Sequence, residues 1–159
     1  MKILAIGYGN TLRGDDGIGP WVAEQIAVQQ WPEVRSLSVP QLTPELAAEI
    51  AEADVVFFID AWATEAQRPQ ARIVALSAPT QSRRLDHLWT PNVLLYLAQS
   101  LYNTTPTAYQ ILIPATRFDY GAPFSDVARA GADWAIATLR NCLQASGQCL
   151  SLLPLLETA

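Results

Sequence analysis

Apolar and polar residues follow one another in blocks that predict strands separated by helices. Short continuous apolar runs are typical of strands that are buried on both faces of a sheet. Apolar residues spaced three or four positions apart, such as Leu94, Leu97 and Leu101, predict helices instead. Strands are expected at residues 2–8, 34–40, 55–59 and 109–113. Strands that alternate with helices favour a parallel sheet with right-handed connections.

Candidate capping residues precede the predicted helices. Serine, threonine and aspartate caps accept hydrogen bonds from the first helical N–H groups, and proline suits the first helical turn. We expect one helix from Asp16 or Pro20 to about Gln30, and three others with Thr43, Thr90 and Ser125 as N-caps.

One further strand, at residues 71–77, is expected to run antiparallel at the sheet edge. The link from Asp60 is short and carries Pro69, whereas a parallel crossover needs about a dozen residues or more, usually with a helix. The central strand is expected to end at Asp60 and the last strand at Pro114. We therefore predict an α/β fold with three layers, αβα, around a mostly parallel five-stranded twisted sheet with one antiparallel edge strand. Residues 1–159 fit a single domain.

The composition argues against several classes of partner. The net charge of −5 disfavours nucleic acid and anionic membrane surfaces. No apolar run approaches the roughly 20 residues of a membrane helix, and the first residues do not form a signal peptide pattern. We therefore expect a cytoplasmic protein without a membrane segment. Cys142 and Cys149 lack metal-site spacing and are interpreted as incidental thiols.

The turn that follows the first predicted strand, residues 6–19 (IGYGNTLRGDDGIG), is the most unusual stretch. Gly7 and Gly9 match the start of a dinucleotide-binding fingerprint, but Leu12 replaces its third glycine. Asp15 and Asp16 would also repel phosphate. Dinucleotide or phosphate binding is therefore a disfavoured alternative.

Two aspartates and the single histidine suggest a metal site. If the first and third strands flank the point where strand order reverses, Asp16 and Asp60 lie side by side at the carboxyl ends of the strands. Adjacent carboxylates repel, and a divalent cation removes that penalty. With His87 on a polar loop, the set suits a borderline ion such as nickel or zinc.

Each of these residues also has an ordinary structural interpretation. Asp15 suits a local turn or cap, Asp16 a helix N-cap, and Asp60 a surface turn. A lone loop histidine such as His87 is often solvated.

The same residues resemble the nickel–iron hydrogenase maturation endopeptidases. The resemblance rests on IGYGNTLRGDDGIG at residues 6–19, FIDA at residues 58–61, and His87 ahead of a leucine-rich helix. Two segments, QLTPEL at residues 41–46 and LAQSLY at residues 97–102, look most like the branch that serves bidirectional, NAD-linked hydrogenases.

The resemblance implies one peptidase domain that removes the C-terminal extension of the hydrogenase large-subunit precursor after nickel insertion. It implies Asp16, Asp60 and His87 as ligands of nickel supplied by the substrate, a site that other divalent metals could occupy. Many relatives carry an Asp-Gly-Gly stretch where this chain has SVPQ at residues 38–41, so no catalytic acid transfers. Gln41 and Asn10 are expected to face the substrate, and a monomer is expected.

The group that activates water stays unassigned, because the sequence holds neither an H-E-x-x-H helix nor a G-x-S-x-G turn. The main rival from another class is a non-proteolytic metal-binding assembly factor for a nickel enzyme. It would bind the nickel-loaded precursor without shortening it.

Overall fold

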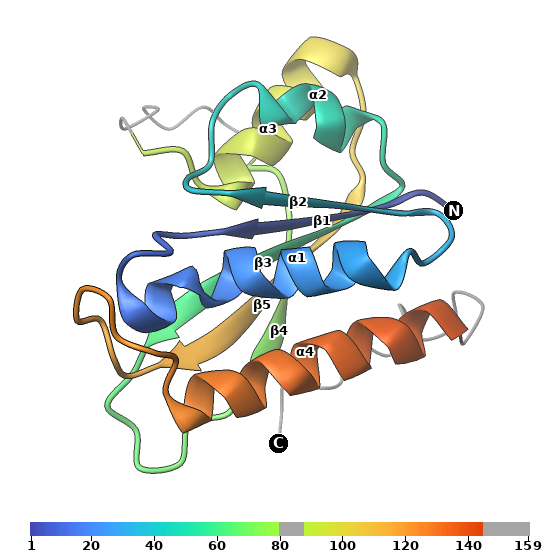
Figure 1. Cartoon of the computed structure of the whole chain (residues 1–159). Helices are drawn as coiled ribbons and strands as arrows, with labels where there is room; N and C mark the ends of the chain where they lie inside the picture. Colours follow the sequence, from blue (N-terminus) through green and yellow to red (C-terminus); the bar gives the residue numbers. More distant parts are fainter. Residues whose placement is uncertain (80–87, 145–159) are drawn as a thin grey trace.

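The computed structural model describes residues 1–79 and 88–144 as a five-stranded sheet covered by helices (Figure 1). The strands lie in the order β2-β1-β3-β5-β4. Their bounds are Ile3–Tyr8 (β1), Val34–Val39 (β2), Val55–Ala63 (β3), Arg72–Leu76 (β4) and Thr107–Ala115 (β5). The helices are Gly14–Gly17 (η1, a 3-10 turn), Ile18–Gln29 (α1), Leu46–Ala51 (α2), Pro91–Tyr102 (α3) and Asp126–Gln144 (α4).

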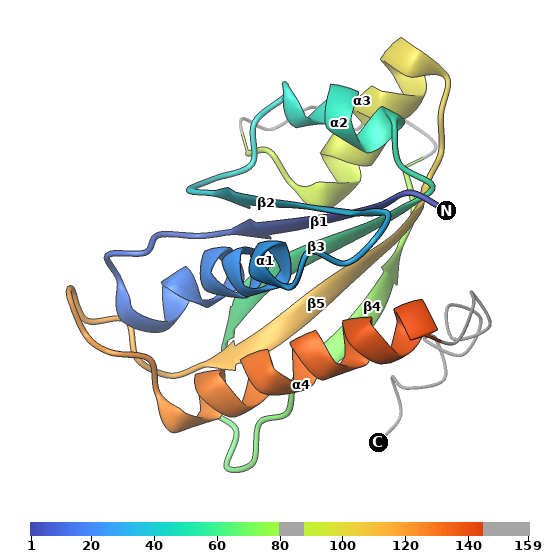
Figure 2. The same ribbon diagram turned by 45° about the vertical axis from the view of Figure 1, so that its right-hand side comes forward.

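Two apolar cores lie on opposite faces of this sheet, which confirms the predicted three-layer αβα fold. Helices α1 and α4 cover one face, and α2 and α3 cover the other (Figures 1 and 2). Successive side chains of β3 alternate between the two cores, so Phe57 and Ile59 face α1 and α4, whereas Val56 and Phe58 face α2 and α3. All four are almost fully buried, as the continuous apolar run predicted.

The strand order reverses between β1 and β3, which meets the condition on which the Asp16–Asp60 hypothesis depended. Strand β1 pairs in parallel with β2 on one side and with β3 on the other. Strand β4 pairs antiparallel with β5 at the edge of the sheet, which confirms the prediction made from the short link after Asp60. The carboxyl ends of β1 and β3 therefore meet at the usual ligand-binding point of an open α/β sheet.

Two predicted strand ends are wrong. Strand β3 continues past Asp60 to Ala63, because these residues still pair with β5, Asp60 opposite Leu112 and Trp62 opposite Pro114. Strand β5 likewise includes Pro114, although β4 pairs with it only as far as the Arg72–Leu112 pair. A charged residue and a proline are thus held in the sheet by long-range pairing that local sequence does not reveal.

One of the predicted helix caps is also wrong. Helix α2 begins at Leu46 with Glu45 as its N-cap and no capping side chain, because Thr43 and Pro44 belong to a preceding turn. The other two caps are confirmed. Thr90 Oγ1 accepts from Val93 N at 3.4 Å, and Ser125 Oγ accepts from Ala128 N at 3.2 Å.

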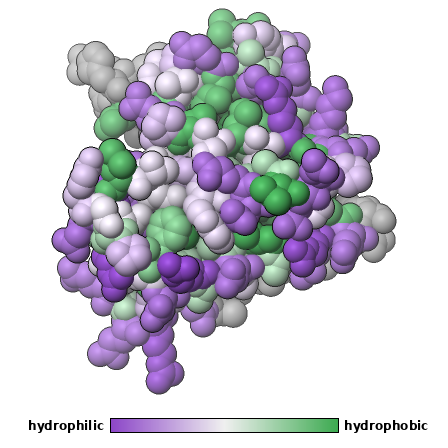
Figure 3. Space-filling model, in the orientation of Figure 1, coloured by the Kyte–Doolittle hydropathy of each residue, from purple (hydrophilic) through white to green (hydrophobic). Residues whose placement is uncertain are grey.

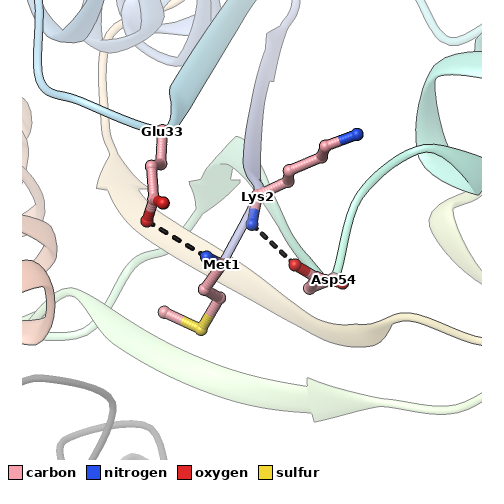
Figure 4. Close-up of polar contacts among 4 residues, drawn as sticks. All are labelled: Met1, Lys2, Glu33 and Asp54. Carbon is pink, nitrogen blue, oxygen red and sulfur yellow. Dashed lines mark hydrogen bonds and ion pairs between the residues drawn. The ribbon is translucent and has the colours of Figure 1, made fainter.

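The amino ends of the strands are tied together at the opposite edge of the sheet (Figure 4). The Met1 ammonium group bonds Glu33 at 3.1 Å, and Lys2 N donates to Asp54 Oδ2 at 2.7 Å. Cys142 belongs to α4 and is buried in the core that α4 covers, whereas Cys149 lies outside the described residues.

On the face seen in Figure 3, hydrophobic residues are interspersed among hydrophilic ones. Within the two described stretches, no helix has the length and apolar character that crossing a membrane requires.

Candidate functional site

Close packing at the start of α1 brings the glycine-rich turn onto the ends of β1 and β3. A Cβ atom at Gly19 would collide with the Ile59 carbonyl oxygen and would lie 2.8 Å from the Tyr8 carbonyl oxygen. Gly7 likewise has no room for a side chain, because the Gly19 carbonyl oxygen lies against it. These glycines thus permit a close helix–strand approach, which places η1 at the carboxyl edge of the sheet.

Asp15 is a buried structural residue with long-range partners. Its carboxylate accepts hydrogen bonds from the backbone N–H groups of Thr116 at 2.8 Å and Arg117 at 3.0 Å. It also accepts from Ser125 N at 2.7 Å and Ser125 Oγ at 2.6 Å. Burial opposes ionisation, but these bonds outweigh it and lower the pKa of Asp15. The local-turn interpretation is therefore wrong, because Asp15 fastens η1 to the segment between β5 and α4.

Asp16, by contrast, is only half-buried and lies at the rim of the site. Its Oδ2 accepts a hydrogen bond from Asn10 N at 2.9 Å. Helix α1 begins at Ile18 with Gly17 as its N-cap and no capping side chain, so the N-cap interpretation of Asp16 is wrong. A carboxylate has two oxygens, and the backbone bond uses one of them.

Asp60 is half-buried in β3 and lies on the face that carries Phe58, toward α2 and α3. Burial and, to a smaller extent, the charge of Asp16 raise the pKa of its carboxyl to about 6, against hydrogen bonds from the Tyr8 hydroxyl and the Ala61 backbone, which lower it. Asp16 is therefore near enough to Asp60 to influence its ionisation electrostatically. The surface-turn interpretation of Asp60 is wrong.

Two residues that sequence reasoning missed support Asp60. The Tyr8 hydroxyl is hydrogen bonded to Asp60, and Gln110 Nε2 donates to Tyr8 Oη at 3.0 Å. A signal was present for Gln110, because it is a polar residue inside the otherwise apolar run of residues 109–113. Tyr8 gave no signal of its own, since a tyrosine at a strand end is ordinary.

The predicted substrate-facing residues, Asn10 and Gln41, are both exposed. Asn10 also shapes the turn, because its Oδ1 accepts from Leu12 N at 2.9 Å. Gln41 lies in the segment between β2 and α2. The predicted ligand His87 lies outside the described residues.

Trp62, Trp89 and Arg117 are large side chains in three different segments, and two of them make local contacts. Trp62 lies beneath Arg72, whose guanidinium carbon is 4.2 Å from the centre of the indole ring. The Arg117 guanidinium bonds the nearby Pro123 carbonyl oxygen at 3.4 Å, so it packs locally. Trp89 is 39% exposed.

A separate cavity of about 470 Å³ lies at the opposite edge of the sheet, near Met1, Trp31 and Arg140. It is remote from both aspartates. Among residues 1–79 and 88–144, no three His, Cys, Asp or Glu side chains form a metal-binding group. The charge of Asp16 nevertheless raises the pKa of Asp60, and a divalent cation between two carboxylates would compensate both charges.

Comparison with solved structures identifies the fold. No protein-family model matches the sequence, and no curated protein matches it. The hydrogenase maturating endopeptidase HybD from E. coli has 20% sequence identity and a TM-score of 0.69, over 92% of this chain and 94% of that chain. The [NiFe] hydrogenase maturation proteases HycI and HybD from Thermococcus kodakarensis have TM-scores of 0.67 and 0.66. The HycI protein is 19% identical, and the match covers 90% of this chain and 92% of that chain. The HybD protein is 22% identical, and the match covers 90% of this chain and 99% of that chain.

The chain has the fold of the hydrogenase maturation proteases. At these identities the likeness establishes the fold alone, and it agrees with the predicted topology. In this maturation-protease fold, the carboxyl edge between β1 and β3 carries Asp16 and Asp60, and the charge of Asp16 contributes to the raised pKa of Asp60.

Proposed function

We propose that this protein is an endopeptidase that removes the C-terminal extension of a nickel–iron hydrogenase large-subunit precursor after nickel insertion. The observation that carries the proposal is the pairing of Asp16 with Asp60 at the strand-order reversal of a maturation-protease fold. The resemblance of residues 6–19 to the maturation endopeptidases supports the same function independently of the overall fold.

In the proposed mechanism, Asp16 and Asp60 bind nickel that the substrate already holds, and His87 is the third ligand. The two carboxylates repel each other, so their pairing is unfavourable without a cation. A precursor that carries nickel supplies that cation, whereas an unloaded precursor does not. The protein thus recognises the loaded precursor through its nickel ion. The exposed residues Asn10 and Gln41 contact the substrate peptide beside the metal.

The test is processing of a nickel-loaded precursor, followed by mass spectrometry. We expect the wild-type protein to shorten the precursor and Asp16→Asn, Asp60→Asn and His87→Ala to shorten it at least about 10-fold more slowly. Asp133→Asn is the matched control, because Asp133 is exposed on α4. Wild-type rates in all three variants would refute the role of the site.

The rival assembly factor makes a different prediction in the same experiment. It would bind the nickel-loaded precursor and leave its mass unchanged. A phosphate or dinucleotide binder would instead be stabilised against heat by ATP or NAD. Close glycine packing against α1 accounts for Gly7 and Gly19 without a phosphate.

We further propose that the substrate belongs to a bidirectional, NAD-linked hydrogenase, on the resemblance of residues 41–46 and 97–102 to that branch. Faster processing of such a precursor than of one from another hydrogenase class would support this assignment. The expected cytoplasmic location and monomeric state stay predictions, and light scattering of the purified protein tests the latter.

A further inference from the structure

Three polar residues lie on the same face of three adjacent strands at the carboxyl edge. Strand β3, which carries Asp60, lies between β1 and β5, which carry Tyr8 and Gln110. The register pairs Gly7 with Ile59 and Phe58 with Gln110. Because side chains alternate along a strand, Tyr8, Asp60 and Gln110 all lie on the face toward α2 and α3.

Gln110 and Tyr8 meet above β3, although their strands are not neighbours. Adjacent strands are about 4.8 Å apart, so β1 and β5 are about 10 Å apart. Gln110 Nε2 donates to Tyr8 Oη at 3.0 Å, and the Tyr8 hydroxyl is hydrogen bonded to Asp60. A hydroxyl has one proton, and since Gln110 donates to its oxygen, that proton is available to the Asp60 carboxylate.

We propose that Tyr8 is a positioning residue that holds one oxygen of Asp60 and so turns the other oxygen toward the substrate's nickel. The inference rests on the proposed function. Gln110 in turn orients the Tyr8 hydroxyl. Ligand carboxylates in metal sites are themselves hydrogen bonded, and such partners fix the direction in which the ligand atom points.

The tyrosine ring and the tyrosine hydroxyl have separable roles here. The ring packs against the apolar core beneath α2 and α3, and a phenylalanine ring would pack there equally well. The hydroxyl makes the two polar contacts. Tyr8→Phe therefore removes the positioning contact while it preserves the packing.

The experiment is calorimetric titration of untagged, chelator-treated protein with Ni²⁺ alone. We expect Tyr8→Phe to weaken Ni²⁺ binding about 10- to 100-fold. The visible spectrum of bound Co²⁺, which reports ligand geometry, should change as well. Tyr102→Phe is the matched control, because Tyr102 is 48% exposed at the end of α3.

A second variant, Gln110→Met, leaves Tyr8 in place and removes only its orienting donor. We expect it to weaken Ni²⁺ binding less than Tyr8→Phe does. Because Gln110 acts through Tyr8, adding Gln110→Met to Tyr8→Phe should weaken binding no further. If the losses of Ni²⁺ affinity in the two single variants simply add in the double variant, Gln110 does not act through Tyr8 and this part of the proposal is wrong.

The Asp60→Asn variant separates failure of this inference from failure of the proposed function. The role of Tyr8 alone would be overturned if Tyr8→Phe kept wild-type Ni²⁺ affinity and an unchanged Co²⁺ spectrum while Asp60→Asn lost binding. Absence of Ni²⁺ binding by the wild-type protein would overturn this inference alone, because the proposed function has the substrate supply the nickel, whereas unchanged binding in Asp60→Asn would overturn both.

Discussion

Replacing Asp60 with asparagine should stabilise the metal-free protein at neutral pH. Burial and the charge of Asp16 raise the pKa of Asp60 from its usual 3.8 to about 6. The folded-state pKa lies above the unfolded one. Below about pH 4 the carboxyl is protonated in both states, so it does not reduce the free energy of unfolding there. As the pH rises through about 6, the carboxyl ionises within the fold and stability is lost.

The pKa difference sets the size of this effect. At about 1.4 kcal/mol for each pH unit, a rise from 3.8 to about 6 corresponds to about 3 kcal/mol at neutral pH. Asp60 is only half-buried, so solvent screening reduces the expected gain to about 1–3 kcal/mol. Asparagine cannot ionise, and its Oδ1 can still accept the Tyr8 hydrogen bond.

Urea unfolding in the presence of EDTA, at pH 4 and at pH 7.5, tests this prediction. Asp60→Asn should exceed the wild-type free energy of unfolding at pH 7.5 and nearly match it at pH 4. Asp133→Asn should change it by less than about 0.5 kcal/mol at either pH, since Asp133 is exposed. A variant no more stable than wild type at pH 7.5, or one equally stabilised at pH 4, would show that Asp60 is not a strained ionised group.

The remaining predictions concern stability and use the same unfolding assay. Asp15→Asn should cost about 2–3 kcal/mol at pH 7.5, because it weakens charged hydrogen bonds that include two from Ser125. The lowered pKa of Asp15 means that the wild-type advantage should shrink as the pH falls through that pKa. Gly19→Ala should cost about 3 kcal/mol or abolish folding, because its methyl group would collide with the Ile59 carbonyl oxygen. Thr90→Ala should cost about 1 kcal/mol through loss of a cap, whereas Thr90→Ser should cost little.

Stabilisation by Asp60→Asn would have a functional meaning. A carboxylate that destabilises its own fold at neutral pH is retained only where another role compensates, and metal recognition is such a role. The Asp16–Asp60 pair would then be an arrangement that is unfavourable alone and favourable with the nickel-loaded substrate.

Local sequence pattern was sufficient to predict most of the architecture. The apolar run at residues 55–59 predicted a strand buried on both faces, and alternate side chains indeed enter opposite cores. The short link after Asp60 predicted the antiparallel edge strand β4, because chain length limits which connections are possible. Such features depend on the spacing of apolar residues and on the length of the connecting segments, both of which can be read from neighbouring residues in the sequence.

Asp15 and Asp16 show where local pattern is insufficient. They are adjacent and chemically identical, yet Asp15 is buried by partners that include Ser125, 110 residues away, and Asp16 faces the site. The Tyr8–Gln110 contact likewise joins residues 102 positions apart. The sequence alone therefore determined the layers, the antiparallel edge strand and the candidate acids. Only the tertiary structure decided which acid is structural and which side chains orient Asp60, because burial and hydrogen bonding depend on segments that folding brings together from distant positions.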